Sequence, residues 1–303
     1  MFELRRLRLL HELALRGTLA AVAEALSYSP STVSQQLAQL EKDAGVPLLE
    51  PDGRRVRLTE YGAALAAHAA RALELEERVR GELAALEPGS GRVRVAAFQT
   101  AAHGILPAAL DLLAERSPRL RVEVAELPPE EGLFELVARG VDLVVAEQYP
   151  GHTRERVSGL TRETIGGDAI RLATPPDEAS RSLAELSGRA WVMEPEGTAA
   201  RQWAVQQCRA AGFEPDVRFE IADLTAHARL IATGHAVGLL PDLLWTDQRA
   251  NVRLVDLPGE PTREIFTATR ASAAAQPAVA ATREALRDAF SARRSQPSFT
   301  QST

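Results

Sequence analysis

Short polar side chains cluster between residues 29 and 39, at the start and along one side of a segment that predicts a helix. Serine, threonine and glutamine can donate and accept hydrogen bonds, and their lengths suit contacts to base edges and phosphate oxygens of DNA. The candidates for such contacts are Ser29, Ser31, Thr32, Ser34, Gln35, Gln36 and Gln39. A surface helix without any ligand can carry the same residue types, so this segment alone leaves both interpretations open.

The residues around this cluster predict two helices joined by a tight turn. An alanine-rich run around Val22 favours the first helix, and residues 27–29 interrupt it. Pro30 suits the first turn of the second helix, because its missing N–H would be unpaired there, and Ser29 is the natural N-cap. The apolar side chains that we expect to face the core are Val33, Leu37 and Leu40. A second helix carried in this way is how a helix-turn-helix reaches the major groove of DNA.

A β-hairpin is predicted directly behind the second helix, after residues 45–49. Residues 50–53 have the composition of a turn, and residues 54–59 alternate arginine with apolar residues as a half-buried strand does. Such a hairpin would be a wing. Its arginines, Arg54, Arg55 and Arg57, are spaced to reach a phosphate backbone or a minor groove, with a merely solvated cluster as the alternative.

Residues 1–90 resemble the winged helix-turn-helix and linker helix of LysR-type transcriptional regulators. The matching segments are residues 4–10 for the opening helix, 17–26 for the second, 33–41 for the recognition helix, and 45–49 with 54–59 for the wing. The family often has a Gln-Pro pair at the start of the recognition helix and an arginine after the serine, where this chain has Ser29-Pro30 and Gln35. The resemblance implies docking into a major groove but carries no base preference.

Composition fits a two-part soluble protein, long enough for two or three domains. No apolar run in the 303 residues approaches the roughly 18 that a membrane span requires, and no secretory segment follows the N-terminus, so we expect a cytoplasmic protein without membrane contact. The net charge is −6, and the basic and acidic residues of the first 58 positions nearly balance. Monomeric DNA affinity should therefore be modest and strongly salt-dependent, and two or more copies should be required.

A single long helix is predicted for residues 59–87, before the hinge-like Pro88-Gly-Ser-Gly91. Apolar residues recur there every seven positions, as in a seam between paired helices: Leu58, Leu65, Ala72, Val79 and Leu86. Glu76 interrupts the second seam position, so we expect a short two-helix dimer contact. The alternative is that this helix packs on its own domain.

Beyond Gly91 strands and helices alternate, which favours a parallel sheet. Strands are expected at 92–97, 120–125, 141–146, 160–165, 169–174, 190–193, 217–221, 236–240, 252–257 and 265–270. Helices are expected at 106–116, 130–139, 198–211, 224–233 and 278–293. The polar tail, residues 294–303, lacks an apolar pattern and is expected to be disordered.

This half resembles the effector-binding domain of the same family, which is like a periplasmic solute-binding protein. The resemblance, covering nearly the whole chain, implies an α/β fold with an all-α N-terminal part: a winged helix-turn-helix, a long linker helix and a two-lobed effector domain. The expected domains are 1–58 for DNA binding, 59–87 for linker and dimerisation, 88–91 for the hinge and 92–293 for the effector. Lobe one would comprise 92–163 and 267–293, and lobe two 164–266.

Ligands of such sheets lie outside the carboxyl ends of strands, near helix N-termini that favour anions. The effector-binding candidates at these places are Gln99, Thr100, Ala101, Glu147, Gln148, Glu194, Thr198, Arg201, Asp223 and Thr225. Thr100 and Thr198 can also serve only as helix caps, and Arg201 can pair with Glu194 or Glu196. If two of the candidate carboxylates face the cleft with Arg201, a ligand with both charges, such as an amino acid, would be complementary.

Catalytic and cofactor motifs are missing from the sequence. It has no Gly-x-Gly-x-x-Gly, no glycine-rich phosphate loop with a lysine, no Gly-x-Ser-x-Gly and no paired histidines at metal spacing. We therefore expect no enzyme, catalytic residue, cofactor or metal site. Cys208, the single cysteine, is expected to be a buried small hydrophobe rather than a redox sensor.

The sequence thus predicts a ligand-responsive bacterial transcription factor. It would bind double-stranded operator DNA, pair through the linker helix and respond to a small-molecule effector. The family resemblance implies a homotetramer assembled through the effector lobes as well, and RNA polymerase is a further candidate partner. The alternative is a DNA-binding regulator whose α/β half only oligomerises and binds no ligand.

Overall fold

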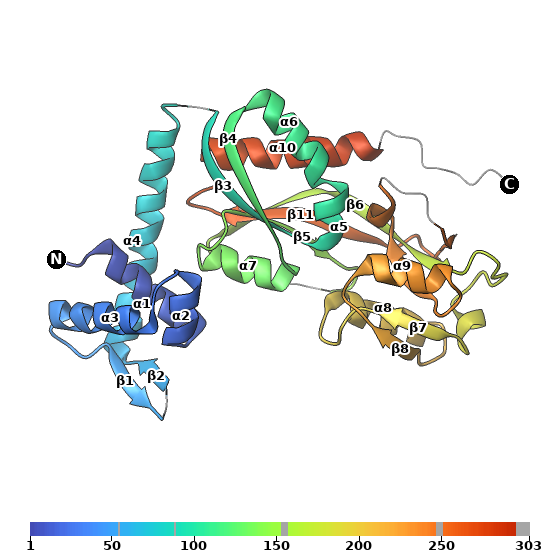
Figure 1. Ribbon diagram of the computed structural model, residues 1–303, viewed down its shortest axis with the longest axis horizontal. Helices are drawn as coiled ribbons and strands as arrows, with labels where there is room; N and C mark the ends of the chain where they lie inside the picture. The colour runs from blue at the N-terminus through green and yellow to red at the C-terminus, as the bar shows by residue number, and fades with distance from the viewer. Residues whose placement is uncertain (54, 88, 153–156, 247–250, 295–303) are drawn as a thin grey trace. The chain divides into compact units, whose positions relative to one another are not determined.

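The computed structural model describes residues 1–53, 55–87, 89–152, 157–246 and 251–294 (Figure 1). Two compact units make up the chain. Unit 1 comprises Met1–Pro88 with Val137–Gly140 and Ser272–Pro277, and unit 2 comprises the remainder. Residues 295–303 of the predicted tail and Arg54 of the predicted wing lie outside the described residues, whereas Arg294 ends a helix. Within the described part, no helix is long and apolar enough to cross a membrane.

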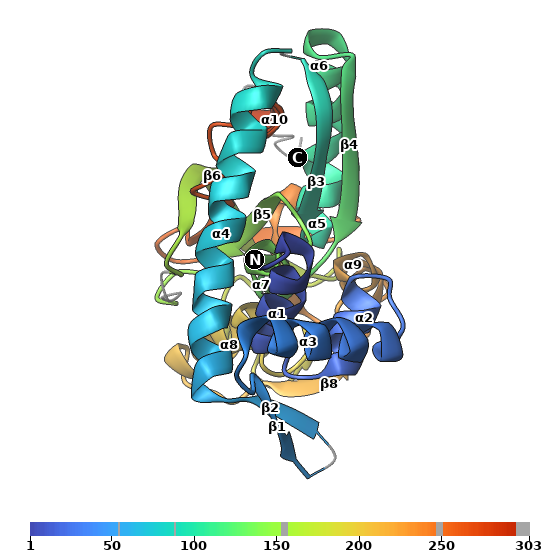
Figure 2. The same ribbon diagram turned by 90° about the vertical axis from the view of Figure 1, so that its left-hand side faces the viewer.

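Unit 1 is a helical domain with a small two-stranded wing. Its elements are α1 (Leu4–Arg16), α2 (Leu19–Ala25), α3 (Pro30–Ala44), β1 (Leu49–Asp52), β2 (Arg55–Leu58) and α4 (Glu60–Ala84). The first three helices surround one apolar core, against which the beginning of α4 also packs (Figure 2). The predicted helix-turn-helix and the predicted long helix are therefore confirmed.

The local signals at the start of α3 act as predicted. Ser29 is the N-cap, its Oγ accepts a hydrogen bond from the Thr32 backbone N–H at 3.1 Å, and Pro30 occupies the first turn. Val33, Leu37 and Leu40 are each at most 1% exposed. Burial of these three side chains fixes which side of α3 faces outward.

The wing differs from the predicted hairpin in its turn. Residues 50–52, predicted as part of the turn, lie in β1, which pairs antiparallel with β2 so that Leu49 is opposite Leu58 and Asp52 is opposite Arg55. Pro51 is tolerated because a two-stranded ribbon has only edge strands, where a missing N–H costs no ladder bond to a further strand. The loop is thus tighter than composition suggested.

The seven-residue seam predicted on α4 is wrong in its first half. Leu58 lies in β2, and Leu65 and Ala72 pack against the core of unit 1. The exposed apolar side chains of the second half of the helix follow a different spacing: Leu75, Val79, Leu83 and, just past its end, Leu86. The periodicity of apolar residues alone does not tell which of them pack against the helix's own domain and which remain exposed.

Unit 2 is built on one mixed sheet rather than the parallel sheet expected. The strand order is β10 (Arg253–Asp256), β6 (Leu160–Thr174), β11 (Thr262–Arg270), β5 (Leu143–Gln148), β3 (Ser90–Ala97) and β4 (Arg119–Glu126), with β9 (Gly238–Pro241) also paired to β6. Only β3 with β4 and β5 is parallel in this sheet. The predicted hinge is shorter than expected, because Ser90 and Gly91 already belong to β3.

Helices cover both faces of the β3–β5 region. α5 (Gln99–Gly104), α6 (Leu106–Arg116) and α10 (Pro277–Arg294) share a core with β3 and β5 on one face, and α7 (Pro129–Val137) covers the other (Figure 1). α6 has the predicted bounds. α5 was not predicted as a helix, because six residues are too short to show helical periodicity.

Two further apolar cores, one at α8 and one at α9, are built largely by the remaining elements of unit 2. These elements are β7 (Ala190–Met193) parallel to β8 (Asp216–Glu220), α8 (Ala199–Ala210), α9 (Leu224–Ala232) and the 3₁₀ turns η1 (Ala184–Leu186) and η2 (Asp242–Trp245). Cys208 is fully buried in the core at α8, and burial first of all raises its thiol pKa to about 12. The thiol is thus a small hydrophobe, as predicted.

β6 is one strand of 15 residues where the sequence predicts two. Gly166 and Gly167 fall in the gap between the two predicted strands, yet both pair with β11. A Cβ on Gly166 would lie 2.1 Å from Cε1 of Phe290, whereas a Cβ on Gly167 would make ordinary contacts of 3.5 Å or more with Thr262. Gly166 therefore lets α10 approach the strand closely, which is a packing role and not a turn.

We expect Gly166→Ala to destabilise the effector half by about 1–3 kcal/mol, because the buried Phe290 ring must shift to admit the methyl group. Gly167→Ala is the matched control and should change stability by less than about 1 kcal/mol, since the added methyl meets no close atom. Urea unfolding followed by tryptophan fluorescence measures both. Equal midpoints for the two variants would show that the Phe290 contact does not constrain β6.

Candidate functional site

The exposed side of α3 begins with a cluster of hydroxyl groups. Ser29 Oγ lies 2.8 Å from both Ser31 Oγ and Thr32 Oγ1. These hydroxyls are shared around the helix cap, so they also satisfy the first turn of the helix.

Two glutamines of α3 make intramolecular side-chain hydrogen bonds, and a third makes none within the described part of the chain. Arg6 Nε donates to Gln36 Oε1 at 3.1 Å, and Gln39 Nε2 donates to Asp43 Oδ1 at 3.0 Å. Ser34 and Gln35 are exposed, and neither side chain has a partner among the residues that the structure describes. Of the predicted base-reading groups, these two are therefore the ones left open.

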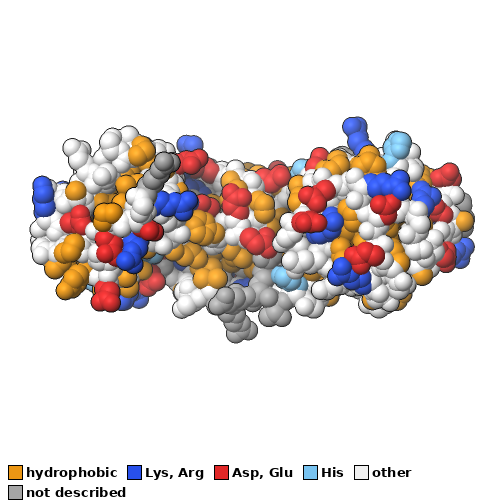
Figure 3. Space-filling view, turned by 90° about the horizontal axis from the view of Figure 1, so that it is seen from below, with side chains coloured by type: hydrophobic (Ala, Val, Ile, Leu, Met, Phe, Trp, Pro, Cys, Tyr) orange, Lys and Arg blue, Asp and Glu red, His pale blue; other side chains and the backbone are white. Residues whose placement is uncertain are grey.

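The wing presents its arginines outward. Arg55 and Arg57 are exposed on β2, and the alternate residue Val56 packs towards the core of unit 1. Arg57 pairs with Glu50 across the hairpin at 2.8 Å, whereas Arg55 has no ion pair with any described residue. On the face shown in Figure 3, acidic and basic side chains are interspersed.

A buried guanidinium organises the candidate effector residues of unit 2. Arg263 on β11 is 1% exposed, and it donates to Asp168 from Nε at 3.0 Å and from Nη2 at 2.9 Å. Its Nη2 also donates to Thr100 Oγ1 at 2.7 Å, and its Nη1 donates to Glu147. Burial opposes this charge, but Glu147 and Asp168 raise the pKa of Arg263 above its ordinary value.

Thr100 and Glu147 thus occupy the predicted place but are engaged by a residue that the sequence analysis missed. Asp168 was missed too, and it receives a further contact from Arg293 Nη2 at 3.3 Å. No local signal marks Arg263, because a polar residue at alternate positions of a strand normally indicates a solvated face. Its partners lie 95 to 163 positions away in sequence.

Gln99 connects α5 to the start of α9. Its Nε2 donates to Asp223 Oδ1 at 2.6 Å, and its Oε1 accepts from the Leu224 backbone N–H at 3.0 Å. Burial raises the pKa of Asp223, but hydrogen bonds from Gln99 and Thr225 outweigh this and leave it below the usual value. The pair joins the two parts of the sheet domain at the place predicted for a ligand.

The Thr198 hydroxyl has the cap role that the sequence left open. It accepts from the Arg201 backbone N–H at 3.2 Å and donates to the Pro195 carbonyl at 2.9 Å. Arg201 Nη1 donates to the Glu194 carbonyl at 3.2 Å and lies 3.9 Å from a carboxylate oxygen of Glu220. Its ion-pair partner is therefore neither of the two glutamates weighed from sequence.

Three further candidates have other surroundings. Ala101 is buried in the core beneath α5, Gln148 Oε1 accepts from Arg162 Nη1 at 2.7 Å, and Thr225 is exposed at the first turn of α9. Within the described residues, no group of His, Cys, Asp and Glu is arranged to hold a metal ion.

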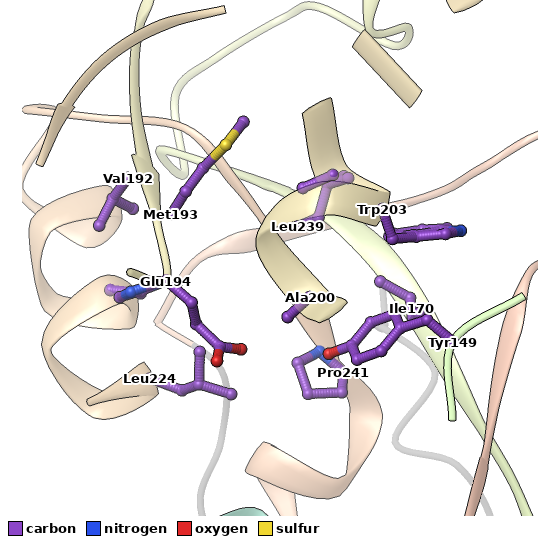
Figure 4. Close-up of a pocket in the computed structure, with 12 residues that line it drawn as sticks. Tyr149, Ile170, Val192, Met193, Glu194, Ala200, Trp203, Leu224, Leu239 and Pro241 are labelled. Atoms are coloured by element: carbon purple, nitrogen blue, oxygen red, sulfur yellow. The ribbon is translucent and has the colours of Figure 1, made fainter. Parts of the chain in front are cut away.

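A small, partly open pocket lies between β7, α8, α9 and the residue after β5; about 20 Å³ of it is enclosed, and the roughly 380 Å³ between its walls is mostly open solvent. Its lining is mostly apolar and aromatic: Tyr149, Ile170, Val192, Met193, Ala200, Trp203, Ala204, Leu224, Leu239 and Pro241, together with Glu194 and His227. The carboxylate of Glu194 and the hydroxyl end of Tyr149 point towards each other across it (Figure 4). Tyr149 and Trp203 were not predicted as site residues.

Glu194 is the unusual group of this pocket. Its carboxylate has no hydrogen-bond or ion-pair partner among the described residues. Burial first, and then the charge of Glu147, raise the pKa of Glu194 to about 8. His227 Nε2 lies 2.7 Å from the Ile221 carbonyl, and burial lowers the pKa of His227, so the imidazole is neutral near pH 7.

Comparison with known families gives two matches. The model described as "LysR substrate binding domain" matches residues 87–291, and the model described as "Bacterial regulatory helix-turn-helix protein, lysR family" matches residues 4–63. The transcriptional dual regulator GltC of Bacillus subtilis is 28% identical over 252 residues, which are 81% of this chain and 82% of GltC. The transcriptional activator IlvY of Salmonella typhimurium is 27% identical over 258 residues, or 83% and 86% of the two chains.

Solved structures share the fold. A full-length OxyR variant from Pseudomonas aeruginosa has a TM-score of 0.68 at 21% identity, covering 96% of this chain and 95% of its own. CbnR, described as a LysR family transcriptional regulator, has a TM-score of 0.53 at 25% identity, covering 94% and 100%. Both alignments extend through the helical half and the α/β half.

Proposed function

The chain belongs to the LysR family of DNA-binding transcriptional regulators and is not an enzyme. From this premise we propose that its α3 reads an operator in the major groove, that α4 pairs two copies, and that a small molecule bound in the α/β half regulates the protein. The proposed domains are residues 1–58, 59–87 and 92–293, with the lobes dividing near residues 163 and 266. The protein would act in the cytoplasm, with RNA polymerase as a further partner.

The proposal that α3 reads DNA rests on exposed side chains whose direction is set by the buried side of the helix. Because Val33, Leu37 and Leu40 are buried, α3 must present Ser34 and Gln35 outward, and these side chains lack intramolecular partners within the described residues. A glutamine amide can pair in a bidentate manner with adenine. Arg55 on the wing, which likewise has no ion pair with any described residue, is then the phosphate contact that orients the domain.

An open apolar row on α4 supports pairing of two copies. Leu75, Val79, Leu83 and Leu86 are 45–78% exposed and follow helical spacing. Side chains of this kind lose contact with water when two helices pack together, which gives the pairing its driving force. A tetramer would need a further contact through the effector halves.

The effector proposed is an amino acid or a similar zwitterion. Its cationic end would meet the uncompensated carboxylate of Glu194, and its anionic end would lie near the start of α8, where a helix N-terminus favours negative charge. The alternative is an α/β half that binds nothing and only oligomerises. It does not explain why the Glu194 carboxylate lies in a pocket without a partner among the described residues.

We expect Gln35→Ala to change base preference and Arg55→Ala to weaken binding to all sequences while reducing the salt slope by about one phosphate contact. Gln39→Ala is the control, because that side chain is already held by Asp43. Binding titrations on operator and random DNA at several salt concentrations measure this. Equal losses on both DNAs for Gln35→Ala and Arg55→Ala would refute the division of roles.

Two glutamates in the exposed row, Val79→Glu with Leu83→Glu, should reduce the mass of the full-length protein in solution and abolish simultaneous binding of two half-sites. Ala84→Glu adds a glutamate on another face of α4 and should change neither. Light scattering with operator titration decides the outcome. An unchanged mass for the double variant would remove this row from the dimer contact.

A thermal-shift screen of metabolites on the full-length protein tests the effector. A ligand that binds only the folded state must stabilise it, by about 2.7 kcal/mol at a hundredfold excess over Kd. We expect hits that carry both an ammonium and a carboxylate, and footprinting with and without a hit should show altered occupancy of the operator. A screen in which no small molecule stabilises the protein would favour the oligomerisation-only reading.

A further inference from the structure

When the Glu194 carboxylate is ionised, it has no counter-ion in direct contact among the described residues. Glu147 on β5 and Glu130 on α7 both act on Glu194, and both raise its pKa. Arg263 is the one guanidinium that acts on it in the opposite sense, and Glu147 outweighs it. Arg263 contacts Tyr149 at the wall of the pocket, but its other N–H groups are held by Asp168, Glu147 and Thr100, and no hydrogen bond joins it to Glu194 among the described residues.

The other polar groups around the pocket supply no cation. His227 on α9 is neutral near pH 7, as shown above. Arg201 on α8 reaches the Glu194 carbonyl and the Glu220 carboxylate, not the Glu194 carboxylate. An isolated carboxylate in such surroundings is costly, so the empty pocket favours its protonated form, and a bound cation would restore the charged form.

Aromatic rings complete the surroundings. Tyr149 and Trp203 line the pocket with their ring centroids 5.7 Å apart and their planes tilted by 40°. The faces of such rings carry negative electrostatic potential and attract organic cations, most strongly where water is excluded. Ile170, Met193 and Leu239 add apolar wall for the body of a ligand.

We propose, resting on the effector-binding function above, that this pocket recognises an organic cation, an ammonium or guanidinium on an apolar stem, with Glu194 as its counter-ion, the rings of Tyr149 and Trp203 beside the charged group and the apolar wall against the stem. A carboxylate on the ligand is then not required for recognition. The cation selects the ligand, and any anionic end only adds to its affinity.

Butylguanidinium and butylurea are the sharpest probes, because they share shape and differ in charge. Calorimetry on the full-length protein should show butylguanidinium binding at least about tenfold more tightly than butylurea or pentanoate. Because butylguanidinium stays charged throughout, its affinity should rise about tenfold per pH unit up to about pH 8, where Glu194 ionises in the empty pocket, and then level off.

Glu194→Gln mimics the protonated side chain, so it should fold normally near neutral pH, lose at least about tenfold in butylguanidinium affinity and lose the pH slope. Glu196→Gln, at an exposed neighbouring position, is the matched control and should change neither the affinity for butylguanidinium nor its pH dependence. Equal binding of butylguanidinium and butylurea, or unchanged butylguanidinium binding by Glu194→Gln, would overturn the proposal. If the cation fails while anionic or neutral metabolites still stabilise the protein, effector binding stands and cation recognition falls; if no small molecule binds, both fall.

Discussion

The burial of one positive charge constrains the whole α/β half. A guanidinium without partners would cost several kcal/mol in a protein interior, so Arg263 can occupy its position only if Asp168 and Glu147 are brought to it. Those partners come from β6 and β5, and Thr100 comes from α5. The network therefore joins the two long central strands, the end of a parallel strand and the first helix of the domain at a single point.

This constraint redistributes the roles of the site residues. Thr100 and Glu147 lie where a ligand of this fold is expected, yet their polar atoms are already committed to Arg263. They hold the wall of the site in place. Ligand recognition, which the sequence analysis assigned to them, is better suited to polar groups that have no intramolecular partner. Glu194 is such a group, because its carboxylate is desolvated and lacks a counter-ion within the described residues.

Local signals predict much of the fold, and long-range pairs explain most of what they miss. The N-cap Ser29 with Pro30 marks α3, and apolar periodicity gives α6 and β7 with the bounds observed, since these patterns report directly on capping and burial. Arg263 and Tyr149 carry no such mark, because their importance comes from partners brought together only by folding. The seam on α4 failed in its first half for a related reason: periodicity identifies an apolar face but not what covers it.

The contacts of α5 suggest how occupation of the site can reach the rest of the domain. Gln99 holds the start of α9 with two hydrogen bonds, and the next residue, Thr100, is held by Arg263. Leu224, whose backbone N–H Gln99 accepts, also lines the pocket beside Glu194. A ligand that changes the charge of Glu194 therefore acts one contact away from the bridge between α5 and α9. It can shift the balance between arrangements of the domain only if one of them binds the ligand better, and the Gln99 bridge, made of half-buried and exposed polar groups that water can partly replace, is a contact that can break at modest cost.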